Sequence, residues 1–158
     1  MGAISKVKRR VVRKLPKGIK GHTRVKVGFP VGKVDNQVMM KAIYNHFGTE
    51  ETVKLTNGSI SQSVVIPARP FLSISFDANA SEYNSILRSE AKKILSDGKD
   101  SGLTMSKLGI LAEGHVRTTI TNLKEPANAA STIKKKGSSN PLVDSGEMKN
   151  ATTHLTYA

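Results

Sequence analysis

An apolar stripe with helical spacing runs from about Leu103 to Leu123 and limits the folds that this chain can adopt. Its members recur every three or four residues, and they are Leu108, Leu111, Ala112, Val116, Ile120 and Leu123. The polar side of the same segment holds Lys107, Glu113 and Arg117, and a proline follows the end at position 126. This spacing predicts an amphipathic helix, because positions three and four residues apart share one face. Such a helix must bury its apolar face against a second layer.

Two further helices are predicted upstream. The first follows a cap at Asn36 or Asp35, and its apolar positions are Met39, Met40, Ile43 and Phe47. The second begins at Asn79 or Ser81 and closes at Gly98, and its apolar positions are Tyr83, Ile86, Leu87, Ala91, Ile94 and Leu95. Asp, Asn and Ser are good N-caps, and a glycine after the last turn accepts the left-handed conformation there.

Segments that alternate like strands lie at both ends of the domain. Residues 23–29 alternate polar and apolar side chains before Pro30, and the Thr-rich residues 151–157 alternate in the same way. Residues 50–63 are predicted to form an exposed hairpin or loop with a turn at Asn57-Gly58. The predicted fold class is therefore α+β, with a small, largely antiparallel sheet and two longer α-helices packed on one face.

Residues 128–148 show no periodic apolar pattern. Compact domains usually join their elements in ~4–6 residues, and loops beyond roughly 12–15 residues tend to be functional or disordered. This segment also has too little apolar surface to fold on its own. We expect a long irregular assembly loop that is ordered by contact with a neighbouring protein. A simple surface loop is the alternative.

Positive charge is concentrated at the N-terminus of the chain, whose formal net charge is +13. Residues 1–34 contain eleven Lys and Arg and no acid, while 35–158 hold 14 basic and 12 acidic residues. We predict a flexible basic arm over 1–22 and a single domain over 23–158. The arm would attract polyanions such as DNA by counterion release, or remain a solvated tail, or dock on an acidic protein. Its expected contact residues are Lys6, Lys8, Arg9, Arg10, Arg13, Lys14, Lys17 and Lys20.

The sequence contains no recognisable catalytic or metal-binding motif. The chain has no cysteine, which excludes disulfides, thiol catalysis and Cys-based metal sites. Its four histidines, at positions 22, 46, 115 and 154, are too far apart for a paired-ligand helix motif. A hydrolase that uses Ser138 or His115 is the weakest alternative, because Ser138 lacks a strand before it and a helix after it. We expect a protein that is not an enzyme and needs neither cofactor nor metal.

Pro67 and Pro70 fix the backbone on either side of Arg69, which is biased towards extended geometry because it precedes a proline. This bracket is predicted to present the guanidinium while Phe71 and Leu72 face the core. Arg69 would then form a bidentate salt bridge with a carboxylate of a neighbouring subunit. An internal helix-capping arginine or a surface arginine is an equal alternative.

Several short motifs occur in a fixed order along residues 36–157. They are Asn45–Thr49, Ile66–Leu72, Leu108-Gly109, Pro126–Ala129, Ser131–Ile133, Lys136–Ser138, Pro141–Gly146 and the terminal Thr-rich strand. In this order they resemble the tail-completion or neck proteins of long-tailed double-stranded DNA bacteriophages, also described as tail-component or virion-morphogenesis proteins. The chain departs from the family pattern at His46, where the family has an acid, and at Met148, where it has an aliphatic residue. The basic residues 1–22 lie outside the resemblance.

The resemblance implies a structural subunit at the head-proximal end of a phage tail. It implies a homo-oligomeric ring that contacts tail-tube and head-completion or adaptor proteins, with a hexamer favoured and a dodecamer as the alternative. The expected location is the neck of the virion, after assembly in the host cytoplasm, with non-specific contact to genomic DNA. No apolar run has the length of a signal peptide or a membrane-spanning helix, so we expect a soluble protein without a membrane partner.

The favoured function is thus a tail-completion or terminator subunit whose ring caps the tail tube and joins it to the head. The candidate subunit or partner interface consists of Arg69, Pro70, Phe71, Asn128, Thr132, Lys136, Pro141, Leu142 and Asp144. The alternative is a small basic nucleic-acid-binding module that uses its N-terminal arm, with residues 35–158 as a scaffold.

Overall fold

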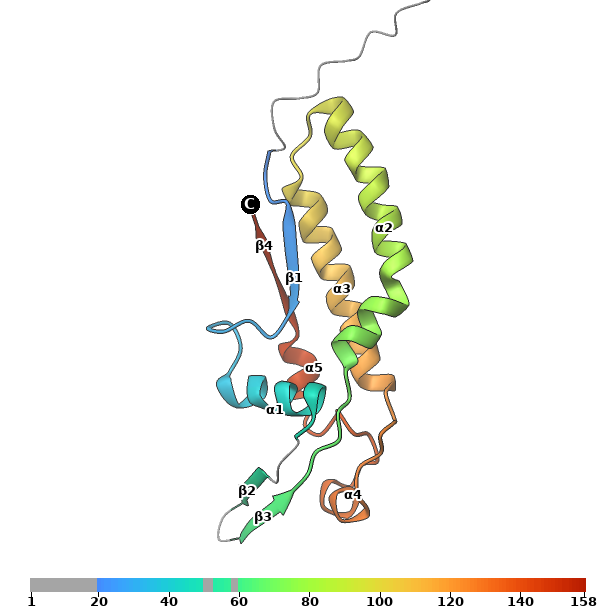
Figure 1. Ribbon diagram of the computed structural model, residues 1–158. Coiled ribbons are helices and arrows are strands. Elements are labelled where there is room, and N and C mark those ends of the chain that lie inside the picture. The colour runs from blue at the N-terminus through green and yellow to red at the C-terminus, as the bar shows by residue number, and fades with distance from the viewer. Residues whose placement is uncertain (1–19, 50–52, 58–59) are drawn as a thin grey trace, which may run out of the picture.

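The computed structural model describes residues 20–49, 53–57 and 60–158. In chain order the elements are β1 (Arg24–Gly28), α1 (Asn36–Phe47), β2 (Val53–Asn57), β3 (Ile60–Val64), α2 (Phe71–Asp97), α3 (Gly102–Asn122), α4 (Ala130–Lys136), α5 (Glu147–Ala151) and β4 (Thr153–Tyr157) (Figure 1). Several helices therefore accompany two small antiparallel sheets, and the predicted α+β class is confirmed. The predicted arm, apart from Lys20 and its neighbours, lies outside the described residues.

The first and last strands of the domain form one sheet. β1 and β4 pair antiparallel in a register that runs from Arg24 opposite Tyr157 to Gly28 opposite Thr153. The predicted terminal strand and its pairing with an earlier strand are confirmed. Val27 lies opposite His154 in this register, and α3 packs against the sheet. The two ends of the domain are thereby joined in one sheet that packs against α3.

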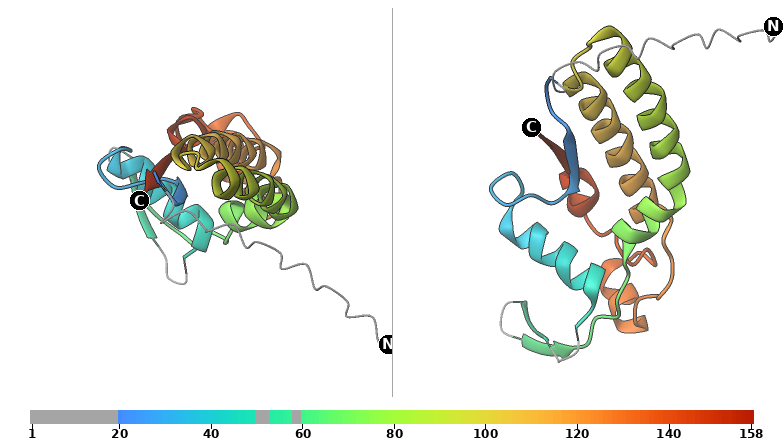
Figure 2. Two further views of the ribbon diagram at one scale, coloured as in Figure 1. Left: turned by 90° about the horizontal axis from the view of Figure 1, so that it is seen from above. Right: turned by 45° about the horizontal axis from the view of Figure 1, so that its top comes forward.

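The two long helices form an antiparallel pair beside this sheet. Seen from above, α3 lies between the β1–β4 sheet and α2 (Figure 2). Both helices are on the same side of the sheet, as predicted, but α3 contacts it directly and α2 packs on α3. The predicted stripe of α3 is largely confirmed, because Leu108, Val116 and Ile120 are buried.

The start of α2 differs from the prediction. The helix begins at Phe71, directly after Pro70, rather than at residue 79 or 81. Phe71 and Ser75 are both buried, so the first turns of α2 are held by core contacts. The polar residue at this second buried position breaks the apolar spacing that sequence reasoning relies on. A proline just before the first turn is compatible with a helix, since the N–H groups there have no intrahelical partner.

The buried face of α1 also differs from the prediction. Asp35 caps the helix as expected, because its Oδ1 accepts the N–H of Gln37 at 2.8 Å and that of Val38 at 3.3 Å. The buried residues are Val38 and Ala42. Met40, Ile43 and Phe47, from the apolar positions of the predicted helix, are 39%, 40% and 73% exposed. α1 approaches α5 and the core through its small residues, which leaves its bulkier stripe on the surface.

β2 and β3 form a separate antiparallel hairpin whose register runs from Val53 opposite Val64 to Asn57 opposite Ile60. The hairpin predicted for this region is confirmed. The second residue of its predicted turn, Gly58, lies outside the described residues. The hairpin extends from the end of the molecule that also holds α4 (Figure 1).

The main core gathers residues from α1, α2, α3 and the end of the chain. Its buried members are Val38, Ala42, Phe71, Val116, Ile120, Leu142 and Met148. The Phe71 ring is fully buried and packs edge-on against Phe29, at 6.1 Å between centroids, and against His46, at 5.3 Å.

The prediction of one irregular loop over 128–148 is wrong. The segment contains α4 and the start of α5, and Pro141, Leu142 and Met148 are buried. Asn140 organises its middle, since its Oδ1 accepts the N–H groups of Leu142 and Val143, both at 3.1 Å. These few apolar residues suffice because each enters a core built by other elements.

Candidate functional site

Arg69 connects two segments that are far apart in the sequence. Its Nε donates to the carbonyl of Pro126 at 2.7 Å, and its Nη1 donates to Asn45 Oδ1 at 3.2 Å. Its Nη2 donates to the carbonyl of Ala127 at 3.2 Å and to Asn128 Oδ1 at 3.3 Å. The side chain of Arg69 is 2% exposed. The prediction that the bracket presents this guanidinium to a neighbouring subunit is therefore wrong, and the alternative of an internal arginine describes the molecule.

The backbone on both sides explains why the guanidinium turns inward. The Arg69 N–H donates to the carbonyl of Asn45 at 2.7 Å, which fixes the segment against the end of α1. The opposing segment offers the carbonyls of Pro126 and Ala127 and the amide oxygen of Asn128 as acceptors. Burial lowers the pKa of Arg69 and the charge of Glu125 raises it, but an arginine remains protonated in either case. The result is a buried cation held by amide and carbonyl oxygens.

A groove of about 1160 Å³ lies beside this arginine. Its walls come from α1, from residues 65–69, from 127–136 and from 141–148. Seven of the predicted interface residues line it, namely Arg69, Asn128, Thr132, Lys136, Pro141, Leu142 and Asp144. Two do not belong to this lining: Phe71 is fully buried in the core, and Pro70 is exposed before α2. The fold thus brings most of the predicted set together around one cavity.

The groove has an apolar floor and a charged rim. Pro141, Leu142 and Met148 are buried in its floor, while the side chains of Lys134 and Lys135 are exposed at the end of α4. The accessible predicted positions are therefore Thr132 and Asp144, with Asn128 and Lys136 half-buried. The buried positions Arg69, Pro141 and Leu142 shape the groove rather than offer side chains at its surface.

The lining of the groove is positively charged overall. The lining contains Lys41, Arg69 and Lys134–Lys136 against the carboxylates of Asp144 and Glu147, which leaves a formal charge of +3. Lys41 Nζ lies 2.9 Å from Glu147 Oε2, so this pair is neutralised locally, and it holds the pKa of Glu147 below its usual range. Lys136 Nζ donates to the carbonyl of Asn140 at 3.1 Å. Burial lowers the pKa of Lys136, an effect that the charge of Asp144 opposes.

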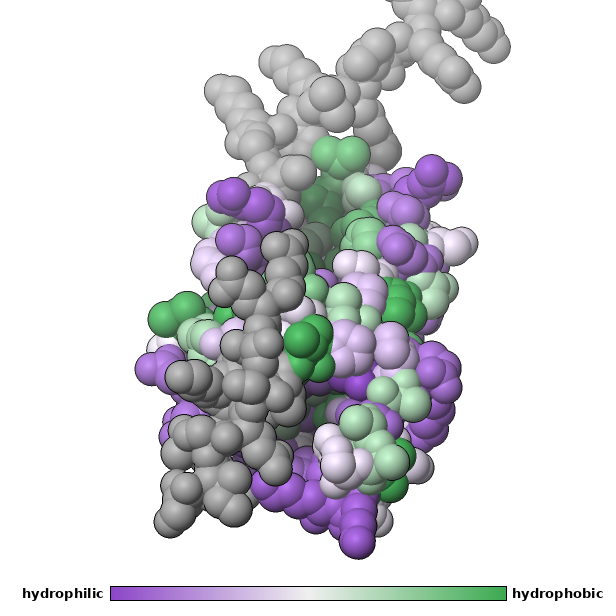
Figure 3. Space-filling model, turned by 60° about the horizontal axis from the view of Figure 1, so that its bottom comes forward, coloured by the Kyte–Doolittle hydropathy of each residue, from purple (hydrophilic) through white to green (hydrophobic). Residues whose placement is uncertain are grey.

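The surface at this end of the molecule is chemically mixed. On the face shown in Figure 3, hydrophobic residues lie in separate clusters among hydrophilic ones. Val65, at 63% exposed, is an exposed apolar residue of the groove lining. Met40, Ile43 and Phe47 form an exposed apolar stripe on α1, the helix that contributes Lys41 and Asn45 to the lining.

Sequence reasoning missed a polar cluster between α3 and β4. His154 Nδ1 lies 2.7 Å from Glu113 Oε1, and Arg117 Nη2 donates to Glu113 Oε2 at 3.2 Å and to the carbonyl of Thr152 at 2.8 Å. Glu113 and Arg117 were assigned to the polar side of the helix, but Glu113 is largely buried, with its side chain 12% exposed. The sequence contains one indication of this close packing, a glycine inside the predicted helix at position 109. A Cβ at this position would collide with the His154 ring. The cluster joins the last strand to α3.

The two residues considered for hydrolysis have separate partners. His115 Nδ1 lies 2.9 Å from the Tyr83 hydroxyl, and Ser138 Oγ accepts the N–H of Asn140 at 3.2 Å. Among the described residues, no group of three or more His, Asp or Glu is arranged to hold a metal ion. Each of the two residues thus has a hydrogen-bond partner within its own domain.

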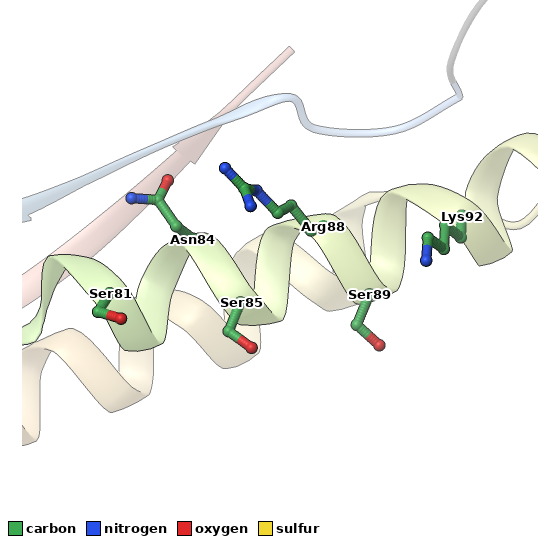
Figure 4. A pocket seen from close by; sticks show the side chains of 6 residues that line it. All are labelled: Ser81, Asn84, Ser85, Arg88, Ser89 and Lys92. Atoms are coloured by element: carbon green, nitrogen blue, oxygen red, sulfur yellow. The ribbon is translucent and has the colours of Figure 1, made fainter.

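A second, smaller hollow of about 550 Å³ follows α2 (Figure 4). Its described lining consists of Ser81, Asn84, Ser85, Arg88, Ser89 and Lys92. The three serines recur every four residues along the helix, while Asn84 and Arg88 point to the other side (Figure 4). All six residues come from one helix, so this hollow is a polar strip without facing groups from a second element.

Comparisons with protein-family models, curated proteins and solved structures gave no match. Within the part of the chain that the structure describes, no helix is both long enough and apolar enough to cross a membrane.

Proposed function

We propose that this protein is a structural subunit of a bacteriophage neck, which completes or terminates the tail and joins it to the head. The observation that carries the proposal is the groove beside Arg69. Motifs that resemble the tail-completion family, 66–72 and 126–146, are distant in the sequence but meet there. The buried arginine holds the two segments together from within. Because residues from these separate motifs line the same groove, we infer that they serve one binding role.

The composition of the groove supports binding rather than reaction. Among the described residues that line it there is no histidine, and its two carboxylates are Asp144 and Glu147. Glu147 is paired with Lys41. A general acid or base needs a titratable group within reach of the reacting atoms. Lysines at the rim and aliphatic groups in the floor are more typical of a protein contact.

The exposed stripe of α1 supports self-assembly. Met40, Ile43 and Phe47 lie on one helical face and are all more than a third exposed. Exposed apolar side chains that share a face often mark an interface. A ring requires a heterologous contact, in which such a face of one subunit meets a different face of the next. We propose that this stripe belongs to the contact between subunits in a ring, with six subunits favoured.

The experiment is a measurement of oligomeric state by size exclusion with light scattering, together with negative-stain images in the presence of tail tubes. Rings are expected for the wild type. Phe47→Ser should weaken them without loss of stability, because this side chain is 73% exposed. The matched control is Phe76→Ser on α2, at 61% exposed, which should leave rings intact. A strictly monomeric protein that also fails to form rings on tail tubes would contradict the proposal.

The same material tests the alternative of a nucleic-acid-binding module. Duplex DNA is titrated at two salt concentrations against the wild type and against a variant that lacks residues 1–21. Tight, salt-dependent binding by a monomer that disappears on deletion would favour the alternative, since counterion release by the arm would then account for the affinity.

A further inference from the structure

We propose that the groove beside Arg69 binds an extended, acidic peptide segment that carries aliphatic side chains and belongs to a different protein. The inference deepens the proposed function and rests on it only for the source of the segment, a neighbouring protein of the virion. The groove is large enough for such a segment, at about 1160 Å³. It is lined by four separate parts of the chain, so its shape depends on the whole domain.

Charge complementarity selects an acidic occupant. The lining carries a formal charge of +3, and its two exposed cations without a hydrogen bond among the described residues are Lys134 and Lys135. They lie in the last turn of α4, where the helix ends at Gly137. Carboxylates that approach this rim gain attraction from both ammonium groups. Lys136 is held by Asn140 further inside and extends the positive potential towards the floor.

The floor selects aliphatic side chains between the carboxylates. Pro141, Leu142 and Met148 are buried apolar residues of the lining, which also contains the half-buried Ile66 and the exposed Pro67 from a distant segment. In an extended peptide, successive side chains point to opposite sides. A segment in which acidic and aliphatic residues alternate can therefore direct one set to the lysine rim and the other to the floor. This arrangement reproduces the apolar centre and polar rim of known protein interfaces.

Two other occupants fit less well. The basic arm of this chain, residues 1–22, has eight Lys and Arg and no acid, so it would be repelled by the rim. Single-stranded nucleic acid needs aromatic platforms for its bases, and the described lining contains none. Nucleic acid also carries a charge at every nucleotide, so some phosphates would meet the carboxylate of Asp144, which lines the same groove. An alternating peptide avoids this repulsion by placing an aliphatic side chain there.

The test measures binding of labelled peptides to the full chain by fluorescence anisotropy. The probe is an acetylated octapeptide of alternating Glu and Leu. Its controls are the octapeptides of alternating Lys and Leu and of alternating Glu and Ser, and an oligothymidine. A second readout follows the ¹³C-methyl resonance of Met148, which lies in the floor.

Because the basic arm also attracts acids, the variants are matched in charge. Lys134→Glu with Lys135→Glu alters the rim, and Lys6→Glu with Lys8→Glu alters the arm by the same total charge. The rim variant should lose about tenfold in affinity for the Glu-Leu peptide, since two exposed attractions become repulsions. The arm variant should lose less than about twofold under the same salt conditions. Both lysines of the rim are exposed, so the fold is retained, which circular dichroism checks.

The inference holds if only the rim variant weakens binding, if the Glu-Ser peptide binds more weakly, and if the Met148 resonance shifts. It is overturned if both charge-matched variants lose equally, if the Lys-Leu peptide or the oligothymidine binds as well as the Glu-Leu peptide, or if the Met148 resonance stays unchanged. Ring formation is measured separately. Rings without peptide binding would refute the groove alone, whereas peptide binding by a protein that never forms rings would refute the neck assignment and keep the groove.

Discussion

Replacement of Arg69 by methionine should destabilise the monomer by about 3 kcal/mol. The change keeps a long side chain of similar shape and removes the four donated hydrogen bonds of the guanidinium. The bond from Nε to the carbonyl of Pro126, at 2.7 Å, is the shortest of them. A hydrogen bond from a charged group contributes ~1.5–3 kcal/mol, whereas longer bonds contribute nearer to ~0.5–1 kcal/mol each. The sum of about 4 kcal/mol is reduced by roughly 1 kcal/mol, because the variant no longer buries a charge.

The assay is urea unfolding followed by circular dichroism, with the slope of the transition compared between variants. An unchanged slope with a lower midpoint indicates lost stability of the native state. The matched control is Arg88→Met, because Arg88 is exposed on α2 and should change stability by less than ~0.5 kcal/mol. The loss at Arg69 should vary little with salt, since its partners are carbonyl and amide oxygens rather than carboxylates.

A stability of Arg69→Met within about 0.5 kcal/mol of the wild type would refute this reasoning. The monomer measurement therefore tests the internal role of Arg69 without knowledge of the ring.

Three other substitutions test contacts elsewhere in the domain. Gly109→Ala should lower the free energy of unfolding by ~1–3 kcal/mol, measured by thermal or urea unfolding, because the added Cβ would collide with the His154 ring. The control is Gly114→Ala, which meets no neighbouring atom and should stabilise α3 by ~0.5–1 kcal/mol. Equal effects of the two substitutions would contradict the close approach of Gly109 to His154. Burial lowers the pKa of His46 below its ordinary value of 6.5, so the folded protein favours the neutral ring. The contribution of His46 to the free energy of unfolding is therefore fully present above pH 6.5 and is lost as the pH falls through the folded-state pKa. His46→Phe should therefore reduce the loss of stability between about pH 7 and pH 5, and an unchanged pH profile would count against this assignment. Asn140→Ala should cost ~1–2 kcal/mol by urea unfolding, since it removes the acceptor for two backbone N–H groups, and a neutral result would show that water replaces it.

The location of the candidate groove follows only in part from sequence patterns. Thr132, Lys136, Pro141 and Asp144 were grouped with Arg69 because they belong to one set of motifs, and they do line one cavity. The motifs did not predict which of these side chains are buried and which are exposed. Whether a side chain faces outward or inward depends on the segment packed against it, and that segment is distant in the sequence.

Arg69 illustrates this limit. The flanking prolines correctly indicate an extended, stiff segment, which is a local property of the backbone. The direction of the guanidinium is set by the carbonyls of Pro126 and Ala127, more than fifty residues away. Nothing in the local pattern records those acceptors.

The sequence by itself determined the features that arise within one segment. It specified α3 through the spacing of its apolar residues, the start of α1 through Asp35, and the two paired end strands through their alternation. These features are local because propensity, capping and periodicity act over a few residues.

Only the tertiary structure decided which surfaces are buried. It turned Arg69 inward, inserted Leu142 and Met148 from a seemingly irregular segment into the core, and exposed the large side chains of α1. It also began α2 at Phe71, because a fully buried aromatic ring outweighs the polar residues around it. Burial is a property of pairs of segments, so its free energy enters only when distant parts of the chain meet.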